Sequence, residues 1–155
     1  MGARSAVFGI LAVTGLAGCD PISGISRTAT VGRLPSRSAV SAALHEVPNI
    51  RSVQLQETKP STGFSLYEGV IRDPAFDQFI YEAPSASGVV EVRETQKGVK
   101  TVRLYRIWMG PRPPKKAFED TRSLMDIVYA HLRQRARALP PPSEVKEELT
   151  RPPLR

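Results

Sequence analysis

VKTVRLYRIWM, residues 99–109, is the longest run of β-branched and aromatic residues in this chain of 155 residues. Such side chains are favoured in β-strands, so the run predicts the longest strand of a sheet. Shorter runs of the same kind precede it, separated by turn residues, at residues 51–57, 64–70, 78–83 and 89–95. Strands joined by short connections pair antiparallel. The region therefore predicts an antiparallel meander of four or five strands.

Helical periodicity is present on both sides of the predicted strands. Ser36 is a good N-cap, and it precedes apolar residues spaced i, i+3, i+4 and i+7, namely Val40, Ala43, Leu44 and Val47. A longer apolar stripe follows Pro113 and Pro114 and consists of Phe118, Leu124, Met125, Val128 and Leu132. One sheet and two amphipathic helices predict a two-layer α+β domain. An N-terminal helix and a longer C-terminal helix are expected to cover one face of the sheet.

The first nineteen residues have the pattern of a targeting segment. Arg4 is followed by an uncharged, mostly apolar run at residues 6–16, which is shorter than the about 20 residues that span a bilayer. Leu16, Ala17, Gly18 and Cys19 come next and resemble the lipobox of bacterial lipoproteins. The resemblance implies cleavage between Gly18 and Cys19 and acyl chains on Cys19 that hold the mature protein to the membrane.

Four segments follow from these patterns. Residues 1–18 are expected to be a lipoprotein signal peptide, and residues 19–35 a lipidated cysteine with a flexible tether, within which a short strand at 25–31 stays open. Residues 36–139 are expected to form the α+β domain, and residues 140–155 a Pro-rich disordered tail. The resemblance places the protein in the bacterial cell envelope, facing the periplasm. The same resemblance implies that Asp20 after the cysteine slightly favours the inner membrane, and the outer membrane stays open.

The sequence contains no recognisable catalytic, metal-binding or nucleic-acid-binding motif. One cysteine and two histidines fall short of a metal ligand set. His131 and His45 are expected to be structural or solvated, and Asp73 and Asp77 to belong to a turn around Pro74. The net charge of +7 attracts anions, but an anchored envelope protein meets lipid headgroups before it meets nucleic acid. We therefore expect no metal, no cofactor and no nucleic-acid partner.

The remaining prediction concerns the face of the sheet that the helices cannot cover. We expect Phe64, Leu66, Phe79, Val90 and Val92 to point toward the helices. The opposite face would then carry Tyr67, Ile80, Arg93 and Tyr105, a composition suited to binding another protein. The expected function is that of a non-catalytic, protein-binding or assembly component of the envelope. Two alternatives stay open: an envelope hydrolase or cell-wall-modifying enzyme with a dispersed site, and a carrier of an apolar ligand.

Overall fold

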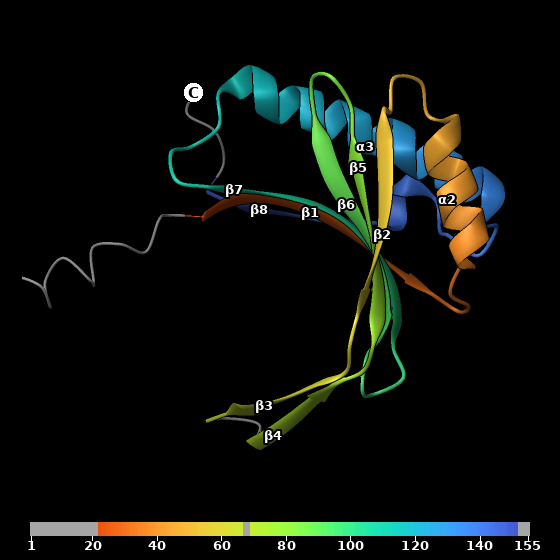
Figure 1. The fold of residues 1–155 in the computed structure, drawn as a ribbon, viewed down its shortest axis with the longest axis vertical. Helices are drawn as coiled ribbons and strands as arrows, with labels where there is room; N and C mark the ends of the chain where they lie inside the picture. The colour runs from red at the N-terminus through yellow and green to blue at the C-terminus, as the bar shows by residue number, and fades with distance from the viewer. Residues whose placement is uncertain (1–21, 67–68, 152–155) are drawn as a thin grey trace, which may run out of the picture.

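The computed structural model describes residues 22–66 and 69–151, and in these residues a large antiparallel sheet and two α-helices form the body of the fold (Figure 1). The main sheet has six strands in the order β2-β5-β6-β7-β1-β8, and β3 pairs with β4 in a separate two-stranded sheet. The described elements in chain order are β1 (Ile22–Val31), α2 (Arg37–Glu46), β2 (Ser52–Thr58), β3 (Ser61–Ser65), β4 (Gly69–Asp73), β5 (Phe76–Glu82), β6 (Ser87–Glu94), β7 (Lys100–Met109), α3 (Lys115–Arg135), the short 3-10 helix η1 (Pro142–Glu144) and β8 (Lys146–Thr150).

The two helices lie on the same side of the main sheet (Figure 1). Alternate residues of the strands point toward them and fill the core, among them Phe79, Tyr81, Val90 and Leu104, each exposed by 1% or less. Ser36 caps α2 by accepting a hydrogen bond from the backbone N–H of Ala39 at 3.2 Å, an arrangement that stabilises a helix by about 1 kcal/mol. The predicted α+β class, with a short N-terminal helix and a longer C-terminal one, is confirmed.

The predicted tether is wrong for residues 22–31, which form β1 in the interior of the sheet, so the strand left open at 25–31 is present and begins three residues earlier. β1 pairs with β7 along its whole length, from Ile22 opposite Met109 to Val31 opposite Lys100. Ile25 and Ala29 are buried in the core at 1% and 0% exposure. Ser26, Thr28 and Thr30, which suggested a tether, occupy the strand's other face, which no helix covers, whereas Ser23 lies on the same side as Ile25 and is 1% exposed. The strand is therefore rich in polar residues although it is central.

The predicted disordered tail is wrong for residues 146–150, which form β8. This strand pairs with β1, and Glu147 reaches Arg27 of β1 at 2.9 Å. Leu139 is buried, and the hydroxyl of Tyr129 donates to the Pro140 carbonyl oxygen at 2.7 Å. These contacts hold the chain against the domain, although the segment has too little apolar surface to fold alone.

Only β5, β6 and β7 follow one another as the expected meander. The pairing of β3 with β4 continues the register of β2 with β5, so residues 52–66 and 69–82 act as the two arms of one long hairpin. In that register Pro60 lies opposite Pro74, and neither residue can donate a hydrogen bond to the ladder. The ladder is interrupted there, and the β3–β4 part bends away from the helices (Figure 1). Phe64 and Leu66 are 74% and 90% exposed for this reason, so our expectation that they face the helices is wrong.

Candidate functional site

The side of the main sheet away from the helices is an uncovered face of mixed polar, aromatic and apolar residues. The strand registers place one row straight across it, which consists of Gln54, Ile80, Val89, Tyr105, Ser26 and Glu148. The neighbouring row consists of Gln56, Gln78, Glu91, Arg103, Thr28 and Lys146. The face therefore combines amides, hydroxyls and both signs of charge with a central apolar and aromatic strip.

Three of the four residues predicted for this face are found on it. Ile80 and Tyr105 both flank Val89, and Arg93 lies farther along β6, opposite Thr101. All three are partly exposed. The fourth, Tyr67, lies outside the described residues, as do Leu16, Ala17, Gly18 and Cys19. The registers of β5, β6 and β7 therefore place these three residues on the same face of the sheet, as the sequence predicted.

Hydrogen bonds and ion pairs hold the centre of the uncovered face in place. The amide nitrogen of Gln78 donates to the Tyr105 hydroxyl at 2.8 Å, and the guanidinium of Arg103 lies 5.0 Å from the centre of the Tyr105 ring. Partial burial, together with the nearby charge of Glu91, raises the pKa of Tyr105. Glu91 is only 6% exposed and approaches Arg93 at 3.7 Å. These contacts restrict the side chains before any partner binds, which lowers the entropic cost of binding.

A cleft of about 940 Å³ adjoins the uncovered face at the base of the β3–β4 hairpin. It lies where the ladder is interrupted, and both Pro60 and Pro74 line it. Phe76 joins it to the uncovered face, because the Arg93 guanidinium stacks over the Phe76 ring at 4.5 Å. The cleft is thus a direct consequence of the two prolines and the bend that they produce.

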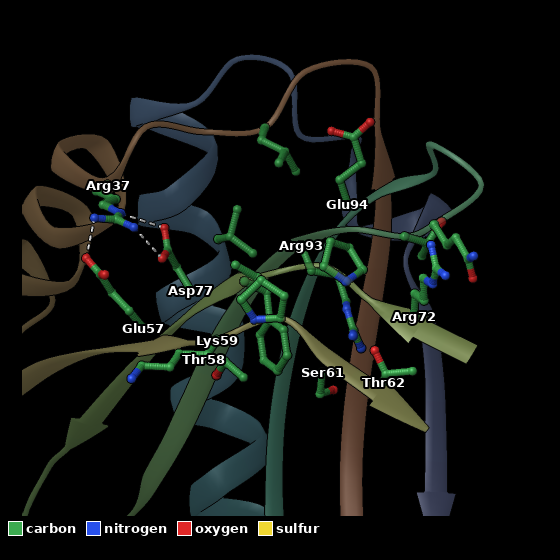
Figure 2. A pocket seen from close by; sticks show the side chains of 18 of the residues that line it. Arg37, Glu57, Thr58, Lys59, Ser61, Thr62, Arg72, Asp77, Arg93 and Glu94 are labelled. Atoms are coloured by element: carbon green, nitrogen blue, oxygen red, sulfur yellow. Dashed lines mark hydrogen bonds and ion pairs between the residues drawn. The ribbon is translucent and has the colours of Figure 1, made fainter. Parts of the chain in front are cut away.

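Charged groups of both signs line the cleft (Figure 2). Arg37, at the start of α2, donates to both carboxylate oxygens of Asp77, at 2.8 and 2.9 Å, and also pairs with Glu57. The hydrogen bonds to Asp77 raise the pKa of Arg37. On the other side of the cleft, Arg72 of the hairpin lies near Thr62 in Figure 2. Within the described ranges neither Arg72 nor Lys59 has an ion-pair partner, so these two cations are available to an anionic group.

The histidines and aspartates considered from the sequence do not meet in this cleft. Neither His45 nor His131 lines it. His45 lies on α2, where its Nδ1 is 2.7 Å from the Ser41 carbonyl oxygen, and His131 belongs to α3. Asp73 ends β4, opposite Ser61, while the Asp77 carboxylate is occupied by Arg37. The described residues thus give the cleft an ion-pair network but no histidine to act as a base.

Several residues of this site were missed in the sequence. Gln78, Glu91 and Arg103 were detectable, since each lies two positions from a residue assigned to the uncovered face, and residues i and i+2 of a strand share a face. Arg37 and Arg72 were not detectable, because their approach to the cleft depends on where α2 docks and where the hairpin bends.

Comparisons with protein-family models, with curated proteins and with solved structures find no match to this chain. Among the described residues, no helix is both long enough and apolar enough to cross a membrane. The same part of the chain contains no group of three or more histidine, cysteine or acidic residues placed to hold a metal ion. The features of this chain that bear on function are therefore the uncovered face and the amino-terminal sequence.

Proposed function

We propose that this protein is a lipid-anchored component of the bacterial cell envelope that binds another protein through the uncovered face of its sheet. The observation that carries the proposal is the one-sided packing of the sheet. Both helices lie on one side, and the other side presents Ile80, Arg93 and Tyr105 to solvent. The anchor is inferred from the lipobox-like residues that end at Cys19.

The composition of the uncovered face supports binding of a protein. Tyrosine and arginine contribute most often to interface energies, because each offers a large contact area with a polar end. Tyr105 is held by Gln78, and Arg93 by Phe76 and Glu91, so both are positioned in advance. Arg72 and Lys59 in the adjoining cleft have no ion-pair partner among the described residues and would favour an acidic side chain or carboxylate on the partner.

The two alternatives receive less support from the described residues. A polar cleft that held His131 beside a carboxylate would favour an enzyme. The cleft at the base of the β3–β4 hairpin is instead lined by carboxylates, with no histidine among its described residues. A carrier would be favoured by an enclosed apolar chamber between sheet and helices. That space is occupied by tightly buried side chains such as Leu104 and Met125, both 0% exposed.

The anchor is tested by Cys19→Ala in the full chain. Formation of the thioether needs the cysteine sulfur, so the variant should lose lipid labelling, remain uncleaved at Gly18 and migrate as a larger precursor. Mass spectrometry of the amino-terminal peptide and membrane fractionation measure both effects. The matched control is Asp20→Ser, which should retain the acyl chains. An unchanged mass and unchanged membrane partition in Cys19→Ala would refute the anchor.

The binding face is tested by photo-crosslinking in native membranes. A photoreactive amino acid at position 105 should give a discrete protein adduct, and the same amino acid at position 127 should not, because Ile127 is an exposed residue of α3. Ile80→Ser should reduce the adduct roughly tenfold with little change in thermal stability, since a well-packed interface residue contributes about 1–2 kcal/mol. Absence of an adduct at position 105, or equal adducts at both positions, would overturn the proposed binding face.

A further inference from the structure

The start of β1 limits how far the domain can lie from its anchor. Ordered pairing begins at Ile22, opposite Met109, and only three residue steps separate Cys19 from Ile22. Even a fully extended chain covers at most about 11 Å in three steps. If Cys19 is acylated, as the proposed function holds, the Ile22 end of the sheet must lie at the level of the lipid headgroups.

That end of the sheet exposes apolar side chains. Ile22, Ile107 and Met109 are 45%, 46% and 65% exposed. The register places Met109 opposite Ile22, and Ile107 opposite Gly24, two residues farther along β1. Along β1 and β7, side chains point alternately into the core and away from it. Ile22, Ile107 and Met109 point away from the core, so all three lie on the uncovered face. They form one apolar patch beside the expected anchor.

The hairpin carries a second group of exposed apolar residues. Phe64, Leu66 and Val70 are 74%, 90% and 59% exposed, and Phe64 pairs directly with Val70. In Figure 1 the hairpin extends toward the left of the view, which is also the direction in which β1 begins and β7 ends. A single flat surface on that side would meet both apolar groups.

Charge on the molecule suits an anionic surface. Arg4 is the only charged residue among residues 1–18, so the net charge falls from +7 in the precursor to +6 in the mature chain. Arg112 is exposed in the loop that follows Met109, next to the apolar patch. Basic side chains near a membrane are attracted to anionic phospholipid headgroups.

We propose that the protein docks on the phospholipid bilayer through a docking rim made of Ile22, Ile107, Met109, Phe64, Leu66 and Val70. The acyl chains supply the anchor, and the rim fixes the orientation by placing its apolar side chains at the boundary between headgroups and acyl chains. The uncovered face runs between the two halves of the rim. A partner bound there is therefore held at the membrane surface.

The test uses the full-length acylated protein in vesicles of phosphatidylethanolamine and phosphatidylglycerol. Trp108 is the only tryptophan, so Trp108→Phe provides a background without tryptophan fluorescence. In this background Leu66→Trp reports on the hairpin half of the rim, and Met109→Trp reports on the half beside the anchor. Ile127→Trp in the same background is the control on α3. Circular dichroism verifies that each variant is folded, and lipids spin-labelled near the headgroup provide the quencher.

Fluorescence from positions 66 and 109 should fall by roughly half or more, since side chains at a bilayer interface lie about 5–10 Å into the headgroup and acyl boundary. Position 127 should be unaffected. No quenching at 66 and 109, in protein whose acylation is verified by mass, would overturn docking and leave the anchor intact. Equal quenching at all three positions would overturn the orientation. An unacylated Cys19 would overturn both proposals, and the mass of its peptide separates that failure from the other two.

Discussion

At the scale of single residues, the absence of a side chain at Gly88 leaves space for the large ring of Tyr81. The two residues are opposite each other on β6 and β5. A Cβ atom added at position 88 would lie 2.4 Å from the Tyr81 hydroxyl oxygen and 2.6 Å from the ring carbon that carries it. The Tyr81 ring therefore lies across the glycine, and position 88 must remain glycine to leave space for it.

Gly88→Ala should destabilise the protein by about 1–3 kcal/mol, because the added methyl group forces a fully buried ring or its strand to move. Denaturant unfolding measures the change in the free energy of unfolding. Gly32→Ala is the matched control, since a Cβ atom there meets nothing within 4 Å, and its effect should stay within about 0.5 kcal/mol. Equal stability of the two variants would contradict the steric role of Gly88.

At the scale of secondary-structure elements, the two strands at the chain ends differ in what they contribute. β1 lies between β7 and β8 and places Ile25, Ala29 and Val31 in the core. β8 is an edge strand whose residues are mostly exposed, and besides its ladder with β1 it is held by the ion pairs of Glu147 with Arg27 of β1 and Arg122 of α3. Arg27 also pairs with Asp126 of α3, so it keeps one partner when β8 is absent.

Truncation should reveal this difference. A chain that ends at residue 145 should still unfold cooperatively, with a loss of a few kcal/mol at most, because it loses only an edge strand of mostly exposed residues and the two ion pairs of Glu147, with Arg27 and with Arg122. A chain that starts at residue 35 should not fold, because the β7 ladder and the core both lose β1. Calorimetry or denaturant unfolding measures both, and a cooperative transition in the chain that starts at residue 35 would contradict the central role of β1.

The sequence was informative where one element carried its own pattern. The i, i+3, i+4 spacing after Ser36 located α2, and the alternation of residues 89–94 placed Val90 and Val92 in the core. β8 was missed, and β1 was left open only as a short strand at 25–31, because the order of both strands depends on partners far away in the chain. Ser26 and Thr28 look like linker residues until the register places them on an uncovered face.

At the scale of the whole molecule, the candidate site arises from the arrangement of layers. Two helices can cover only one side of a six-stranded sheet, so an uncovered face could be predicted from the element count, together with Ile80, Arg93 and Tyr105. The cleft, in contrast, could not be predicted from the sequence. It requires that Pro60 and Pro74 meet in register, which is a property of the complete hairpin and of no local pattern.

The stability of the whole molecule should depend on pH in the alkaline range, and the sign follows from the tyrosines. Burial raises the pKa of Tyr81 strongly, and it also raises the pKa values of Tyr105 and Tyr129. In the unfolded chain a tyrosine titrates at about pH 10. Below that pH both states hold the proton, and these residues add no pH dependence. Above it the unfolded chain releases protons that the folded protein retains, so stability falls as pH rises.

Tyr81 should dominate this loss because its side chain is fully buried and its hydroxyl has no hydrogen-bond partner among the described residues. Its contribution to the slope should be about 1.4 kcal/mol per pH unit above about pH 10. Tyr81→Phe should remove that contribution and leave the protein as stable as before, or more stable, at neutral pH, since an unpaired buried hydroxyl is costly. Urea unfolding at a series of pH values compares the two slopes. Lysines also titrate in this range, but they are the same in both proteins and cancel in the comparison. Equal slopes would mean that the Tyr81 hydroxyl reaches water in the folded protein and that the core beneath Gly88 is open.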